Sequence, residues 1–303
     1  MQEFFIESKF DDLDLSCLLM EAKGKPKGIV QIAHGMSEHK ERYIPFMEFL
    51  VSKGYIGIIN DHRGHGKSIK SPEDLGYFYD DKALEIVDDL YTVTKYIKEK
   101  YPEVPVCLFG HSMGSMVVRN YIAKYDDKVD KLIVCGSPSK TLGVNIGIEL
   151  VNILSKIKGD HYRSKFIDNM LFGSYDEKFL KESEKNTWLS KNRENVKNYN
   201  DDELCGFVFT LNGFKNLFYL MKNTYKKSRY EVKNSSLPIL FIAGSNDPVI
   251  EDIESWHLAQ EFLKKVGYTN IKGIIYNDLR HEILNEEENA KVFSDILTFF
   301  DEE

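Results

Sequence analysis

Apolar residues occur along the chain in short unbroken runs that alternate with segments of helical spacing. The runs expected to form strands cover residues 28–35, 55–61, 104–110 and 129–137. The segments expected to form helices cover residues 43–54, about 82–100 and 115–125. A strand that is apolar throughout is buried on both faces, as the parallel strands of an α/β sheet are. The order of strands and helices therefore predicts an α/β fold with a mostly parallel, doubly wound sheet.

The same pattern extends this sheet toward both ends of the chain. Two short strands are expected at 3–10 and 13–22, joined by a turn at Asp11-Asp12. Near the C-terminus the alternation returns. The expected elements there are strands at 237–244 and 271–276 and helices at about 254–266 and 290–303.

Residues 138–236 interrupt this order. The stretch is helical in spacing, aromatic and rich in lysine and asparagine, and it contains no convincing strand. We therefore expect one α/β core, formed by residues 1–137 and 237–303, into which 138–236 are inserted as a helical lid or cap.

Two stretches of the expected lid, 143–157 and 206–221, are apolar over much of their length. Docking of the inserted helices on the sheet explains part of this character. The remainder suits an apolar channel for an acyl chain. Phe214 and Phe218 are the candidate residues for the wall of such a substrate pocket, and the sequence leaves both interpretations open.

Charge and length narrow the classes of partner. The net charge of −8 argues against nucleic acid, which rewards clustered lysine and arginine. The longest apolar runs are too short for an integral membrane segment. The first residues are acidic where a signal peptide would be basic, so we expect a cytoplasmic protein.

The cysteines show no spacing typical of a metal site, and neither a metal nor another cofactor is expected. They are expected to be buried free thiols, because they are far apart and most lie in apolar segments. These cysteines are Cys17, Cys107, Cys135 and Cys205.

One pentapeptide carries candidate chemistry. Residues 110–114, Gly-His-Ser-Met-Gly, match the G-x-S-x-G pattern of a nucleophile elbow, and they lie between an expected strand and an expected helix. The turn is so tight that side chains at Gly110 and Gly114 would collide with their surroundings. Ser112 is therefore the candidate nucleophile. The helix that follows directs its N-terminal N–H groups toward the reacting centre, where negative charge develops.

A serine nucleophile needs a histidine base and an acid that orients the histidine. In this topology the acid and then the histidine follow the serine along the chain, each in a loop after a strand. Asp247 and His281 occupy such loops. Asp278 competes as the acid, but Asp247 is favoured because it directly follows a buried strand and Pro248 stiffens its turn.

Acyl transfer also needs N–H donors that bind the oxyanion. The backbone N–H of Met113, next to the nucleophile, is one candidate. The loop after the strand at 28–33 offers the N–H of Met36 as the second. Gly35 beside it has no side chain to hold this loop away from a substrate.

The other histidines are expected to serve structure. His62 and His65 form a His-x-x-His pair, but no third metal ligand of the usual kind is near them in sequence. His34 and His111 are expected to shape the loops around the nucleophile. The histidines expected on the surface are His39, His161 and His257.

Five blocks of the sequence together resemble one branch of the α/β-hydrolases. That branch is the monoacylglycerol lipase and lysophospholipase-like group, also known as the serine aminopeptidase S33 group. The resemblance covers about residues 29–137 and resumes from 237 nearly to the end. The blocks, in the order of that group, are HGMSEHKERY (34–43), NDHRGHGKS (60–68), GHSMGS (110–115), GSNDPV (244–249) and RHEILNE (280–286).

The resemblance implies a serine esterase that cleaves carboxylic esters of the monoacylglycerol or lysophospholipid type through an acyl-enzyme. The small-molecule ester or lipid substrate would be the main partner. A thioesterase or a peptidase with the same triad, and a ligand-binding protein without turnover, are the alternatives. The residues implied as the triad and the oxyanion donors are Ser112, Asp247, His281, Met36 and Met113.

Two positions depart from the pattern of the group. Ser37 stands where the first loop often has a second glycine, and Ser115 stands where the elbow often continues with glycine. Both lie next to the expected acyl site, so both affect its shape.

Overall fold

Eight strands form one twisted sheet in the computed structural model, which describes residues 1–141, 143–182 and 184–302. Their order across the sheet is β1-β2-β4-β3-β5-β6-β7-β8. The second strand, β2, runs antiparallel to both of its neighbours, β1 and β4, and the six strands from β3 to β8 run parallel to one another. The strands are β1 (Gln2–Glu7), β2 (Asp14–Met20), β3 (Gly28–Ala33), β4 (Tyr55–Asn60), β5 (Val106–His111), β6 (Lys131–Cys135), β7 (Ile239–Gly244) and β8 (Ile271–Tyr276).

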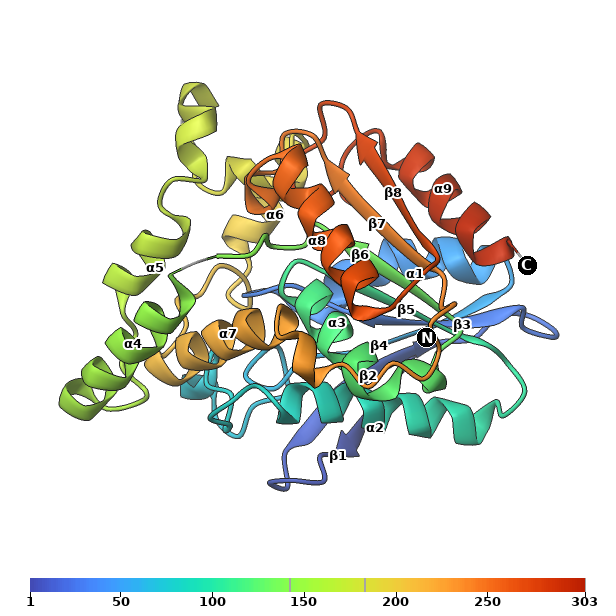
Figure 1. Cartoon of the computed structure of the whole chain (residues 1–303), viewed down its shortest axis with the longest axis horizontal. Coiled ribbons are helices and arrows are strands. Elements are labelled where there is room, and N and C mark those ends of the chain that lie inside the picture. Colours follow the sequence, from blue (N-terminus) through green and yellow to red (C-terminus); the bar gives the residue numbers. More distant parts are fainter. Residues whose placement is uncertain (142, 183, 303) are drawn as a thin grey trace.

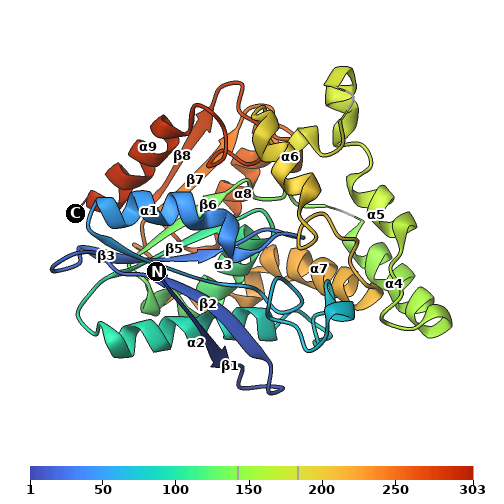
Figure 2. The same ribbon diagram turned by 180° about the vertical axis from the view of Figure 1, so that it is seen from behind.

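Helices cover both faces of this sheet (Figures 1 and 2). One face carries α2 (Glu85–Lys100), α3 (Met113–Tyr125) and α8 (Ile253–Val266). The other face carries α1 (Ile44–Ser52) and α9 (Asn289–Asp301). Short 3₁₀ helices lie at Lys40–Tyr43, Pro72–Asp74, Asp126–Lys128, Asp176–Glu182, Thr187–Leu189, Lys227–Arg229 and Pro248–Ile250.

The central strands are apolar throughout because each of their faces contacts a hydrophobic layer. In β5, Leu108 points into the layer beneath α2 and α3, whereas Cys107 and Phe109 point into the layer beneath α1 and α9. Successive side chains of a strand alternate between the two faces. A strand in this position therefore needs apolar residues at every position, which is why unbroken runs indicated a doubly wound sheet.

Within the described residues, four α-helices come between β6 and β7 in the chain, and Figure 1 shows most of this segment beyond the carboxyl ends of the parallel strands. The last of them runs beside α3 and connects this group to the sheet. The interruption of the strand order after the sixth strand matches the sequence analysis, whereas the treatment of 138–236 as a separate lid stays a prediction. The four helices are α4 (Val144–Lys158), α5 (Lys165–Phe172), α6 (Arg193–Asp201) and α7 (Leu211–Thr224).

The predicted α/β fold with a mostly parallel, doubly wound sheet is confirmed. Cysteines 17, 107, 135 and 205 are all buried and unbridged. In the part of the chain that the structure describes, no helix is both long enough and apolar enough to cross a bilayer.

Candidate active site

Ser112 lies where β5 turns directly into α3. Its backbone has φ 53° and ψ −118°, a conformation that a residue with a side chain rarely adopts. Such a conformation costs about 1–3 kcal/mol and persists only where the surroundings enforce it. Here the surroundings are backbone: a Cβ at Gly110 would collide with the carbonyl of Gly114, and one at Gly114 with the carbonyl of Ala33. The close approach of α3 to β3 therefore holds Ser112 in its strained turn.

The structure brings His281 and Asp247 together. Nδ1 of His281 lies 2.9 Å from Oδ2 of Asp247, and both side chains are buried. The other carboxylate oxygen of Asp247 accepts a hydrogen bond from the backbone N–H of Val249, at 2.8 Å. The carboxylate is thus fixed on both sides and holds one tautomer of the imidazole, with Nε2 free.

Asp278, the competing acid, does not share this arrangement. It is exposed at a left-handed turn with φ 61°. Its backbone N–H donates to Oγ of Ser245, at 2.9 Å. Asp278 therefore shapes the loop that leads to His281, and Asp247 is the carboxylate next to the imidazole.

Ser112 and His281 line the same cavity, but the structure shows no hydrogen bond between their side chains. Hydrogen bonds of this kind are often long in an enzyme without substrate and tighten when substrate binds. The serine, the histidine and the aspartate are therefore gathered at one place, and the hydrogen bond between the serine and the histidine would have to form when substrate binds.

The two predicted oxyanion donors lie at the same cavity. Met36 and Met113 both line it. Their backbone N–H groups have no hydrogen-bond partner within the described residues. A Cβ at Gly35 would lie 3.2 Å from Cβ of Ser112, so the loop after β3 touches the nucleophile. A Cβ at position 35 would also lie 2.6 Å from Oε1 of Glu38, so these two close approaches together favour glycine there.

Glu38 fixes that loop, and sequence analysis missed it. Its Oε1 accepts from the backbone N–H of Gly35 at 2.5 Å and from the hydroxyl of Tyr43 at 2.9 Å, and lies 3.4 Å from Nδ1 of His111. Burial alone would raise the pKa of Glu38, but His111 and Arg42 together hold it well below its usual value. The carboxylate therefore stays charged while buried.

Arg42 joins this loop to the loop of His281. Its guanidinium lies 2.7 Å from Oε2 of Glu38 and binds both oxygens of Glu282 at 2.7 Å. It also donates to Oδ1 of Asn195 on α6, at 3.1 Å. The backbone N–H of Glu282 donates to the carbonyl of Leu189, at 2.7 Å. One largely buried cation thus connects the loop after β3, the loop of His281 and the inserted helices.

Two further residues touch the histidine. A Cβ at Gly136, where φ is 54°, would lie 3.0 Å from the imidazole of His281, so only glycine lets the loop after β6 pass there. The ring centroid of Trp188, from the inserted segment, lies 5.1 Å from that of His281. Gly136 lies near the end of the strand expected at 129–137, where a glycine is a visible signal of a turn, whereas nothing in the sequence indicated Trp188.

The two serines that depart from the family pattern are both accommodated. Ser37 has φ 51°, a left-handed conformation that favours glycine. Its carbonyl accepts from the N–H of Gly206 at 2.9 Å and from the hydroxyl of Tyr199 at 3.1 Å. Oγ of Ser115 donates to the carbonyl of Ser112, at 2.5 Å. Hydrogen bonds from the inserted segment hold Ser37, and a hydrogen bond within the elbow holds Ser115, so both serines fit at positions where the family often has glycine.

A cavity of about 1280 Å³ opens above Ser112. Its floor is the elbow and the loop after β3, and its walls come from the inserted helices. The wall residues of α4 and α7 are apolar: Ile146, Leu150, Leu217, Phe218 and Met221. The volume exceeds what most drug-sized ligands need.

The structure corrects the expectation for Phe214. This residue is fully buried, does not line the cavity, and packs against Phe209 with ring centroids 5.9 Å apart. Phe214 and Phe218 are four residues apart and share a face of α7, but Phe214 lies one turn closer to the start of the helix. Of the two residues predicted for the pocket wall, only Phe218 lines the cavity.

The remaining histidines mostly follow the expectation. His34, His62 and His65 are buried, and burial lowers the pKa of His34 and of His65 to about 3, so these imidazoles stay neutral. In the described part of the chain, they meet no third ligand that would complete a metal site. His39 is a correction: it is buried, not exposed, because Glu41 and Asp202 bind its two nitrogens.

Comparison with known proteins assigns the chain to a family. Residues 24–288 match the family model described as serine aminopeptidase, S33. The chain belongs to this family. The family predicted from the five sequence blocks is therefore confirmed.

The most similar curated proteins include several lipases. The monoglyceride lipase homolog of Monkeypox virus is 25% identical over 269 residues, which cover 88% of this chain and 86% of that protein. The monoglyceride lipase of Homo sapiens is 24% identical over 291 residues, covering 93% and 85%. The probable lysophospholipase L2 of Haemophilus influenzae is 22% identical over 281 residues, covering 90% and 83%.

Solved structures agree with the fold. A thermostable carboxyl esterase from Bacillus coagulans is 26% identical, with a TM-score of 0.88 and coverage of 99% of this chain and 98% of that one. The predicted kind of enzyme, a carboxylic ester hydrolase of the monoacylglycerol lipase and lysophospholipase-like type, is confirmed at the level of the family.

We predict that Arg42→Met destabilises the protein by about 3–5 kcal/mol, because it leaves Glu38 and Glu282 buried without their cation. Urea denaturation measures this change. The matched control is Lys197→Met, which removes a pair with Asp201 whose side chains are 73% and 64% exposed. That loss costs at most about 1 kcal/mol. Equal, small effects of the two substitutions would show that Arg42 does not tie the loops together.

Proposed function

We propose that the protein hydrolyses carboxylic esters through an acyl-enzyme on Ser112, with Asp247 and His281 completing the triad. One observation carries the proposal: a strained serine, an imidazole–carboxylate pair and two unpartnered backbone N–H groups meet at one cavity. Membership of a hydrolase family supports it.

In the proposed reaction, His281 takes the proton of Ser112 as Oγ attacks the ester carbonyl. The N–H groups of Met36 and Met113 bind the oxyanion, and Asp247 stabilises the imidazolium that forms. His281 then protonates the leaving alcohol, and the acyl group stays on Ser112. A water molecule activated by His281 releases the acid in a second, equivalent round.

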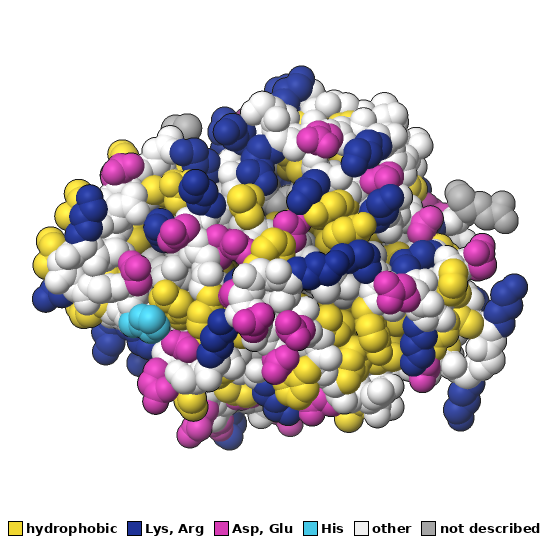
Figure 3. Space-filling model, turned by 90° about the horizontal axis from the view of Figure 1, so that it is seen from below, with side chains coloured by type: hydrophobic (Ala, Val, Ile, Leu, Met, Phe, Trp, Pro, Cys, Tyr) yellow, Lys and Arg dark blue, Asp and Glu magenta, His cyan; other side chains and the backbone are white. Residues whose placement is uncertain are grey.

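We further propose lipid esters of the monoacylglycerol or lysophospholipid type as substrates. The apolar walls of the cavity suit an acyl chain, and relatives carry names of lipases that act on monoacylglycerols or lysophospholipids. Apolar side chains are also exposed on α4 and α5, at the left end of the molecule in Figure 3, and two of them, Ile146 and Met170, reach the cavity. Residues 138–236 would then act as the lid through which such a chain enters, in a protein that we expect in the cytoplasm.

The direct test of the nucleophile is Ser112→Ala. We expect hydrolysis of a p-nitrophenyl ester to fall by at least about 10⁴-fold, because removal of one triad member disables the unit. Circular dichroism and thermal unfolding should show an intact fold. Unchanged turnover by the folded variant would refute the proposed mechanism.

The choice of acid is tested by a matched pair of substitutions. Asp247→Asn should lower kcat by about 10⁴-fold, because the amide favours the wrong imidazole tautomer. Asp278→Asn should change kcat by less than about tenfold, since its carboxylate lies in an exposed turn. The opposite ranking would mean that Asp278 orients His281.

The acyl channel predicts a dependence on chain length. From acetate to decanoate, kcat/KM should rise by up to about fourfold per methylene, the equivalent of about 0.8 kcal/mol, and then level off when the channel is full. Phe218→Ala should weaken long-chain esters more than acetate, which does not reach Phe218.

Phe214→Ala is the control for that experiment. Phe214 lies in the core outside the cavity, so its truncation should lower thermal stability and affect all esters alike. A flat profile of the wild-type protein from acetate to decanoate, measured on protein of unaltered stability, would contradict the acyl channel. It would favour a hydrolase of small esters, a thioesterase or a peptidase. Parallel assays with a thioester and a peptide amide distinguish these.

A further inference from the structure

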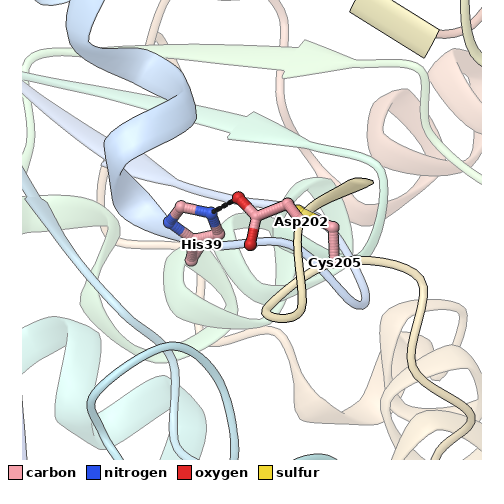
Figure 4. A group of neighbouring side chains, drawn as sticks. All are labelled: His39, Asp202 and Cys205. Atoms are coloured by element: carbon pink, nitrogen blue, oxygen red, sulfur yellow. Dashed lines mark hydrogen bonds and ion pairs between the residues drawn. The ribbon is translucent and has the colours of Figure 1, made fainter. Parts of the chain in front are cut away.

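A second group of reactive side chains lies outside the proposed triad, where the loop after β3 meets the segment after α6. Figure 4 shows His39 and Asp202 facing each other, with Cys205 beside Asp202 on the same loop. One nitrogen, one carboxylate oxygen and the sulfur of these three residues all lie within 4.8 Å of one another. We propose that His39, Asp202 and Cys205 bind one Zn²⁺ ion.

The donor atoms are those that zinc selects. Imidazole nitrogen, thiolate sulfur and carboxylate oxygen are its usual protein ligands, and three protein ligands leave a fourth tetrahedral position for water. With a neutral imidazole, one thiolate and one carboxylate as ligands, the complex of the Zn²⁺ ion and its ligands has no net charge. A neutral complex suits this place, because His39 and Cys205 are buried.

The surroundings orient two of the ligands. Nδ1 of His39 lies 2.6 Å from Oε2 of Glu41, which leaves Nε2 for the ion. Histidines that bind metals typically donate their other N–H to a carboxylate or carbonyl in this way. Oδ1 of Asp202 accepts from the backbone N–H of Leu204 at 2.8 Å, which fixes the turn and leaves Oδ2 on the side of His39.

The distances are close to those of a bound site. Bonds of about 2.0–2.3 Å in a tetrahedron separate the ligand atoms by roughly 3.3–3.8 Å. Nε2 of His39 and Oδ2 of Asp202 are now 2.8 Å apart, so they share a proton and would move apart slightly around the ion. The thiol would move inward by about 1 Å. Asp202 is about one-third exposed, which gives an ion a path from solvent.

An ion pair alone explains less of this arrangement. Between Glu41 and Asp202, His39 is bound at both nitrogens, so the two carboxylates are accounted for. The buried thiol of Cys205, however, carries no disulfide and is not needed to pair the imidazole with the two carboxylates. In the zinc complex the proton on Nε2 of His39 and the thiol proton of Cys205 leave to solvent, and all three side chains have a role.

A bound ion would connect residues at the rim of the cavity. Gly206, next to Cys205, donates its N–H to the carbonyl of Ser37 at 2.9 Å, and Oγ of Ser37 donates to the carbonyl of Phe207 at 2.8 Å. These residues line the cavity beside the oxyanion loop. A bound ion would therefore tie this part of the inserted segment to the loop that carries Met36.

Zinc titration of the metal-free, untagged full-length chain tests the proposal. Calorimetry should show one Zn²⁺ per chain, and zinc should raise Tm by a few degrees, because an ion that binds only the folded state stabilises it. Co²⁺ in place of Zn²⁺ should give the charge-transfer absorption of a thiolate ligand. Cys205→Ser should weaken binding by at least about tenfold and abolish that absorption.

Cys107→Ser is the matched control, since Cys107 is also a buried free thiol but lies in β5. It should bind Zn²⁺ and Co²⁺ as the wild type does. His39→Asn should remove the shift in Tm; if this variant does not fold, Cys205→Ser and the cobalt spectrum still decide. Failure of the wild type to bind zinc, or equal affinity in Cys205→Ser, would overturn the proposal. Ser112→Ala should bind zinc normally, so this test is independent of the proposed hydrolysis.

Discussion

The close approach of α3 to β3 is the constraint on which the proposed site depends. Glycine at 114 lets the first turn of α3 touch the carbonyl of Ala33, and this contact forces Ser112 into its strained turn. Met113, the first residue of α3, and Met36, in the loop after β3, both line the cavity beside this contact. The backbone contact thus brings the serine and the two candidate oxyanion donors to one place.

Buried charge holds the loops around this turn. Ion pairs of Arg42 with Glu38 and Glu282 connect the loop after β3 to the residue after His281, and a hydrogen bond from Arg42 to Asn195 extends this connection to α6. Removal of one member would leave uncompensated charge in a buried place, so the three loops are energetically coupled. A displacement of the inserted helices would therefore change the position of His281 through its neighbour Glu282 and its contact with Trp188.

The sequence predicted those features that follow from local order. Unbroken apolar runs indicated the sheet. Asp247 and His281 each lie in a loop after a strand, and this was enough to predict that the two side chains would meet. Phe214 and His39 were misjudged because helical spacing or polarity does not say what covers a side chain. His39 and Asp202 are 163 positions apart, as Glu38 and His111 are 73 apart, so only the folded chain reveals these contacts.

The proposed mechanism requires that Ser112 be the one activated serine of the folded chain. Labelling with a fluorophosphonate, followed by mass spectrometry of the digested protein, measures this activation. We expect one adduct per chain, on Ser112, and no adduct when the chain is unfolded before labelling. An adduct on another serine, or none on a folded chain, would show that Ser112 is not the nucleophile.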